Sequence, residues 1–143
     1  MVKKCALFRV NLMKTHELLK ELRHKEELKS VVLNAPKSIQ EEFGKRGFLI
    51  TAKKPDRFQF ALLFVRDKAE VEKHLRPTID NVEYDSVFWI AYPKGGSPMK
   101  TDINRDILWE LLKPFGYQPV SQIAIDKDWS AMRLRPIEQV KSK

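Results

Sequence analysis

The chain has little cysteine and no long hydrophobic run, and each absence excludes a class of protein. Of its 143 residues only Cys5 is a cysteine, so no disulfide can form within the chain and no cysteine cluster can hold a metal. No segment approaches the roughly 18 consecutive apolar residues that a transmembrane helix needs. The apolar part of the N-terminal stretch MVKKCALFRVNLMK is interrupted by Arg9 and Asn11. We therefore expect neither a membrane span nor a signal peptide, and we expect a cytoplasmic protein.

Glycine-rich phosphate loops are missing as well. A dinucleotide or S-adenosylmethionine site of the usual kind needs glycines after the first strand, and the stretch NAPKS at residues 34–38 has none. A Walker A motif needs a glycine before its Lys-Thr pair, whereas Met99 precedes Lys100 and Thr101. The histidines lack the spacing of metal ligands, and no serine or cysteine has a recognisable base near it. We therefore expect no metal site, and neither a cofactor nor a catalytic residue can be named.

Positive charge is in excess, but it is scattered along the chain. The 27 lysines and arginines outnumber the 19 acidic residues and give a net charge of +8. Such a charge suits a phosphate-rich partner, because neutralising phosphates releases their counterions. However, no run contains five like charges, and acidic residues lie among the basic ones. The pattern favours a solvated basic surface and leaves nucleic acid as the less favoured partner.

Short apolar segments predict the strands of one α/β domain spanning residues 1–143. Six strands are expected, at residues 31–33, 48–51, 59–65, 86–92, 120–125 and 129–135. The third of them is apolar without alternation, which is typical of a strand buried on both faces in a parallel sheet. The connection at residues 126–128 is so short that the last two strands must form an antiparallel hairpin. Asp126 and Asp128 are interpreted as residues that cap this turn locally.

Capping residues mark where the helices are expected to begin. The four expected N-caps are Thr15, Ser38, Asp67 and Thr101. Ser38 and Asp67 are each followed three residues later by a glutamate, which is the capping-box spacing. The order of strands and helices predicts a three-layer, Rossmann-like sheet of about six mostly parallel strands that ends in the hairpin. Residues 1–13 are expected to form an extension, and residues 137–143 a frayed polar tail.

Three stretches of the sequence carry a resemblance to a known family. They are VVLNAP at residues 31–36, FWIAYPK at residues 88–94 and IDKDWSAMRL at residues 125–134. With TD at the start of the long helix and LKPFG at its end, they resemble an uncharacterised bacterial family catalogued only as a domain of unknown function. The resemblance spans roughly residues 18–136. It implies the fold and leaves the activity open. The long helix and the closing hairpin are also similar to the C-terminal half of methyltransferase-like Rossmann folds.

Candidate binding residues follow the strands, because ligands of open parallel sheets bind beyond the carboxyl ends of strands. These candidates are Asn34, Lys37, Tyr92, Lys94 and Lys100. Asn34 could supply a donor and an acceptor, Tyr92 a hydroxyl or a stacking face, and the lysines positive charge. The loop at residues 94–102 has two glycines and two lysines, which suit an anion site. Its acid at position 102, expected in the first helical turn, would repel an anion and favours a plain connection.

The hairpin offers a second candidate site. Alternation along the last strand places Trp129 and Arg133 on one face, where they could form a stacking platform for a ring or base. In the alternative interpretation Trp129 packs on the long helix and Arg133 pairs with an acid.

The leading functional hypothesis is a binding module for a small anionic or nucleotide-like ligand at the strand ends. Two alternatives remain open: a diverged transferase or methyltransferase-like enzyme, and a nucleic-acid or protein interaction domain that uses the basic surface. The sequence indicates neither the oligomeric state nor the identity of the ligand.

Overall fold

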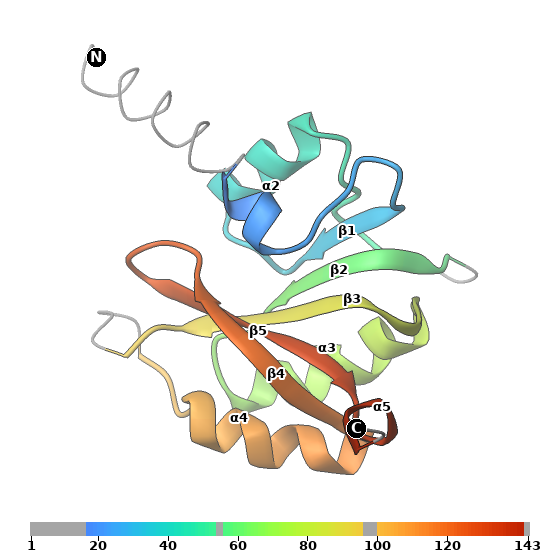
Figure 1. The fold of residues 1–143 in the computed structure, drawn as a ribbon. Coiled ribbons are helices and arrows are strands. Elements are labelled where there is room, and N and C mark those ends of the chain that lie inside the picture. The colour runs from blue at the N-terminus through green and yellow to red at the C-terminus, as the bar shows by residue number, and fades with distance from the viewer. Residues whose placement is uncertain (1–16, 54–55, 96–99, 142–143) are drawn as a thin grey trace.

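A five-stranded sheet forms the centre of the computed structural model, which describes residues 17–53, 56–95 and 100–141 (Figure 1). The strands within these residues are β1 (Ser30–Leu33), β2 (Phe58–Phe64), β3 (Val82–Pro93), β4 (Tyr117–Ala124) and β5 (Trp129–Pro136). Their order across the sheet is β1-β2-β3-β5-β4. The pairs β1–β2 and β2–β3 are parallel, whereas β3–β5 and β4–β5 are antiparallel. The sheet is therefore mixed.

Helices cover both faces of this sheet. The helices α3 (Lys68–Asp80) and α4 (Arg105–Leu112) pack on one face, below the sheet in Figure 1. The helix α2 (Lys37–Lys45) and the helical residues 17–21 cover the opposite face. A 3-10 turn, η1 (Lys113–Phe115), continues α4, and the short helix α5 (Ile137–Lys141) follows β5. The expected α/β class is confirmed.

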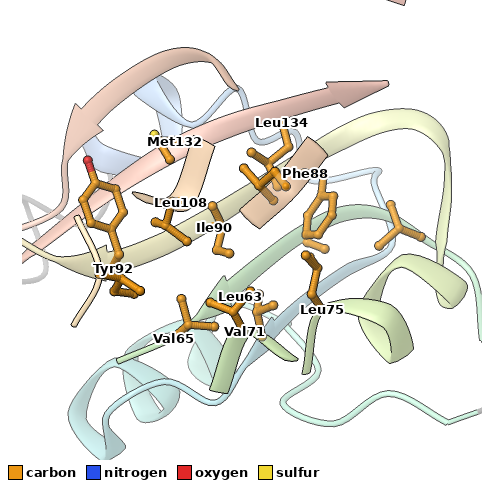
Figure 2. Packing of buried hydrophobic residues seen from close by; sticks show 14 of the residues in the cluster. Leu63, Val65, Val71, Leu75, Phe88, Ile90, Tyr92, Leu108, Met132 and Leu134 are labelled. Carbon is orange, nitrogen blue, oxygen red and sulfur yellow. The ribbon is translucent and has the colours of Figure 1, made fainter. Parts of the chain in front are cut away.

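The strand β2 explains why helices cover both faces of the sheet. Its residues Phe58, Ala61 and Leu63 join the apolar cluster under α3 and α4, part of which Figure 2 shows. The alternating residues Phe60 and Leu62 join the cluster on the opposite face. Burying each large apolar side chain contributes roughly 1.5–3 kcal/mol, so a strand of this composition is most stable between two helical layers.

The expectation of about six strands is wrong because residues 48–51 form no strand. Leu49 makes a single parallel bridge with Val31 at the outer edge of β1. The side chains of Leu49 and Ile50 are 46% and 44% exposed, so this apolar run has no second face to bury. Gly47 precedes it with φ +91°, a left-handed conformation that turns the chain after α2.

The expectation of a mostly parallel sheet is also wrong, since only two of the four pairings are parallel. The expected antiparallel hairpin is confirmed, but its second strand lies inside and its first strand lies at the edge. Burial explains this order. β5 buries residues on both faces, whereas most residues of β4 are exposed or half-buried. The more apolar strand takes the place beside β3.

Of the expected helix caps, only Asp67 is confirmed: its Oδ1 accepts a hydrogen bond from the amide of Glu70 at 2.9 Å. Ser38 is not a cap, because α2 begins after Pro36 without any side-chain cap. Thr101 is not a cap either, since α4 begins at Arg105 and its N-cap is Asn104. Thr15 and residues 1–13 lie outside the described residues, as do residues 142–143 of the expected tail.

Candidate functional site

A cavity of about 400 Å³ opens where β3 ends, between β3, β5 and the start of α4. Its polar lining consists of Tyr92, Lys94, Thr101, Asn104, Arg105, Gln122 and Ser130. We call it the strand-end cavity. Its volume lies within the range of roughly 300–1,000 Å³ that is usual for small-molecule sites.

The strand register brings residues distant in sequence to this cavity. Tyr92 pairs directly with Ser130 across the antiparallel β3–β5 ladder. Gln122 of β4 pairs with Met132, two residues further along β5 and on the same face of the sheet. The ladder closes where the amide of Lys94 donates to the carbonyl of Asp128 at 2.8 Å. Three strands therefore present one polar side chain each beneath the start of α4.

Tyr92 provides a protonated hydroxyl at the floor of the cavity. Its side chain is 3% exposed, and Figure 2 shows it at one end of the apolar cluster with its hydroxyl pointing away from the aliphatic side chains. Burial raises the pKa of the Tyr92 phenol, while the charge of Arg105 and a hydrogen bond with Ser130 lower it. The hydroxyl thus stays protonated at neutral pH and can donate a hydrogen bond to an anion.

Two cationic side chains line the same cavity. Lys94 is half-buried, and its Nζ donates to the carbonyl of Asp126 at 3.3 Å. Arg105, the first residue of α4, lies 3.7 Å from the carboxylate of Asp106. Both side chains of that pair are largely exposed, at 63% and 85%, so their attraction is screened by water and holds Arg105 only weakly. Arg105 can therefore turn toward a ligand.

The loop before α4 is fixed to the neighbouring connection between β2 and α3. The hydroxyl of Thr101 donates to the carbonyl of Arg66 at 2.5 Å, and Oδ1 of Asp102 accepts from the amide of Lys68 at 2.8 Å. The sequence interpretation placed Asp102 in the first turn of α4, where its charge would repel an anion. The structure corrects this: Asp102 lies at the start of α3, and the exposed Asp106 is the acid in the first turn of α4.

Asn34 and Lys37 lie away from the strand-end cavity, at the end of β1. The Nδ2 of Asn34 donates to the carbonyl of Phe64 at 2.9 Å and to Oε1 of Glu70 at 3.2 Å. Asn34 also lines a smaller cavity of about 280 Å³ beside His74 of α3. Lys37 is the exposed first residue of α2, and Lys100 is exposed next to residues 96–99, which lie outside the described part of the chain.

Trp129 and Arg133 lie on the opposite face of the sheet from the strand-end cavity. Trp129 is 4% exposed and packs edge-to-face against Phe64 at 4.9 Å, so the alternative expectation that it packs on α4 is wrong. Its burial leaves no free ring face for stacking. Burial lowers the pKa of Arg133, as do the nearby charges of Arg23 and Arg135.

No acid among the described residues pairs with Arg133, and its Nε is buried without a hydrogen-bond partner there. The nearby Asp85 is held instead by two hydrogen bonds from Arg135, at 2.9 and 2.8 Å. The interpretation of Asp126 as a turn residue is confirmed, since its Oδ1 accepts from the amides of Asp128 and Trp129.

The sequence interpretation located Tyr92 and Lys94 at the strand end but missed Arg105, Gln122 and Ser130 as their neighbours. Recognising Asn104 as the N-cap of α4 would have placed Arg105 at the helix start, beside the strand end. No comparable signal exists for Gln122 and Ser130, because their positions depend on the strand order.

Two further kinds of site were searched for in the described part of the chain, a metal centre and a membrane span. Among the described residues, no group of three or more His, Cys, Asp and Glu side chains could hold a metal ion. No helix in this part of the chain has both the length and the hydropathy that crossing a bilayer requires.

A scan against protein-family models finds no match, and a search of curated proteins finds none either. These two comparisons therefore leave the family open.

Proposed function

We propose that the protein binds a small anionic ligand in the strand-end cavity. The observation that supports this proposal is the convergence of Lys94 and Arg105, from two different elements, on a cavity whose floor carries the hydroxyls of Tyr92 and Ser130. A carboxylate or phosphate in this position would accept charge-assisted hydrogen bonds from the two cations, and the planar guanidinium of Arg105 could engage two oxygens at once.

The composition of the cavity favours binding over catalysis. Its described lining contains no carboxylate, imidazole or thiol that could act as a general base or nucleophile. The transferase alternative would have to rely on Lys94, Tyr92 or Ser130, or on a base from the substrate or from outside this lining. We therefore propose a binding module and keep the methyltransferase-like enzyme as the alternative.

A Rossmann-like assignment of the fold belongs to the same proposal. It is supported by the three parallel strands β1, β2 and β3 and by a cavity at the carboxyl end of β3. The reversed strand β5, inserted between β3 and the edge strand β4, favours the methyltransferase-like variant expected from the sequence.

A thermal-shift panel of inorganic phosphate, pyrophosphate, AMP and S-adenosylmethionine tests the proposal. A ligand at about 100 times its Kd stabilises the folded state by about 2.7 kcal/mol, which raises Tm by roughly 5–15 °C for a domain of this size. We expect Lys94→Ala and Arg105→Ala each to abolish most of the shift. Lys37→Ala, which removes an equal charge away from the cavity, should retain it. A shift that survives both cavity variants would refute the assignment.

The nucleic-acid alternative predicts a different result in the same assay. Binding through dispersed lysines and arginines depends steeply on salt, because each neutralised phosphate releases counterions. A stabilisation by duplex DNA or RNA that disappears by about 200 mM salt and is insensitive to Arg105→Ala would favour the interaction domain.

A further inference from the structure

A second cavity, of about 300 Å³, adjoins the strand-end cavity. It lies between α4 and the edge strand β4, and its walls include Trp109 and Val120. Arg105 and Gln122 line both cavities, so the two share a boundary. We call the second one the Trp109 cavity. The two lie next to each other at α4: Lys94 lines only the strand-end cavity, whereas Trp109 and the exposed Asp106 line only the second one.

Trp109 is exposed in a way that the other tryptophans are not. Its side chain is 39% exposed, whereas Trp89 and Trp129 are exposed by 1% and 4%. The adjacent Leu108 is fully buried under α4, which directs the next residue of the helix away from the core. The half-exposed Val120 lies on the facing strand.

The wall opposite Trp109 suits a planar polar ring. The strand β4 has the sequence YQPVSQIA and contains no charged residue. Val120 supplies apolar contact, and Gln122 supplies an amide. An indole face with an amide nearby can stack on a nucleobase and hydrogen-bond its edge.

We propose that the two cavities bind the two ends of one ligand, a nucleoside monophosphate. The phosphate would lie in the strand-end cavity near Lys94, and the base against Trp109. Arg105 and Gln122 line both cavities and would contact the ribose phosphate where the ligand passes from one cavity to the other. This inference rests on the proposed function and adds the class of ligand.

The binding of AMP, GMP, CMP, UMP and ribose 5-phosphate, measured by calorimetry on the full chain, tests the proposal. Because a stacked base contributes roughly 5- to 100-fold to affinity, at least one nucleotide should bind that much more tightly than ribose 5-phosphate. Trp109→Ala should reduce the affinity for that nucleotide to that for ribose 5-phosphate. Tyr84→Ala, which removes an aromatic residue at the opposite end of β3 that is 57% exposed, is the matched control and should have no effect.

Tryptophan fluorescence gives an independent readout. The chain has three tryptophans, and because two of them are buried, acrylamide reaches mainly Trp109. A bound nucleotide should protect the fluorescence from acrylamide, and ribose 5-phosphate should not.

The outcomes separate the two proposals. Equal affinity for nucleotides and ribose 5-phosphate, or a Trp109→Ala variant with unchanged nucleotide affinity, would overturn the inference and leave the anion site intact. Protection that increases with protein concentration in the absence of ligand would assign Trp109 to a contact between copies and would also overturn it. If neither the phosphates nor the nucleotides bind, both proposals fail.

Discussion

Among single residues, Asn34 combines an unusual backbone conformation with a side-chain Nδ2 that donates two hydrogen bonds. Its φ of +58° lies in the left-handed region, where asparagine is several-fold enriched over other non-glycine residues. Its amide group donates to Phe64 and Glu70 and thereby joins the end of β1 to the end of β2 and the start of α3. The residue that the sequence suggested as a ligand contact thus has a structural role.

Replacing Asn34 separates these two contributions. Asn34→Ala loses both hydrogen bonds and adds left-handed strain, so we expect the free energy of unfolding to fall by about 1–3 kcal/mol. Asn34→Gly loses the hydrogen bonds but adopts the conformation without strain, and should be less destabilising. Urea denaturation measures both. An Asn34→Ala variant of unchanged stability that binds phosphate less tightly would instead place Asn34 in a ligand site.

His24 is a second residue whose setting has a measurable consequence. Its ring packs against Phe48 at 4.6 Å and against Phe60 at 4.9 Å, and its Nε2 lies 2.9 Å from Oγ of Ser30. Because the Ser30 hydroxyl donates its proton to the carbonyl of Leu28, Nε2 must be the donor to Ser30.

Burial lowers the pKa of His24 below 6.5, and the nearby Glu26 and Glu27 oppose this shift only in part. As the pH falls below 6.5, the unfolded chain therefore takes up a proton before the folded protein does. We therefore expect His24 to contribute its whole stabilisation above pH 6.5. The free energy of unfolding should decrease as the pH falls from there to the lower pKa of the folded state.

Urea denaturation on either side of pH 6.5 measures this dependence. His24→Gln should flatten it, whereas His74→Gln should retain it. An equal pH dependence in the wild type and His24→Gln would show that His24 is not responsible.

Among the elements, α4 shows why a helix start could not be read from the sequence alone. Thr101 and Asn104 are both favourable N-caps, and local propensity does not decide between them. Contacts with a distant segment decide: Thr101 bonds to Arg66, and Asp102 bonds to Lys68. Asn104 is then left to cap the helix, with Oδ1 accepting from the amide of Ile107 at 2.9 Å. Within the described part of the chain Asp67 makes no such competing contact, and its capping-box pattern was sufficient.

The Asp102 contact should support both stability and binding, because it holds the segment at residues 100–104 that leads into Arg105. Asp102→Ala removes the acceptor for the amide of Lys68 and should lower the free energy of unfolding by about 1 kcal/mol, as the loss of a capping side chain does. Anion affinity should fall as well. Asp102→Asn keeps an acceptor oxygen and should retain most of both. An Asp102→Ala variant as stable as the wild type would contradict this role.

At the scale of the whole molecule, the sequence predicted which segments are buried better than how they are arranged. The unbroken apolar run of β2 and the tight turn at residues 126–128 were sufficient for a covered sheet and for a hairpin. Which strand of the hairpin pairs with β3 depends on which of the two buries more surface, and tertiary packing decides this. The same choice brings Ser130 and Gln122 to the strand-end cavity, which explains why the sequence indicated Tyr92 at this strand end but not these two neighbours.

Amide hydrogen exchange tests this arrangement directly. Strands β2, β3 and β5 each have a hydrogen-bonded neighbour on both sides, whereas β4 pairs only with β5 among the described residues. We expect the slowest exchange in the three inner strands and faster exchange in β4, because edge amides open without breaking the core.

Residues 48–51 distinguish the five-stranded sheet from the six strands expected earlier. Only the amide of Leu49, which donates to the carbonyl of Ser30 at 3.0 Å, belongs to the bridge with β1. Ile50 and Thr51 should therefore exchange rapidly, while Val32, which donates to the carbonyl of Leu49 at 2.9 Å, is protected. Slow exchange throughout residues 48–51 would mean that a sixth strand extends the sheet beyond β1. Slow exchange in β4 equal to that in β5 would mean that the edge beside the Trp109 cavity is covered in solution.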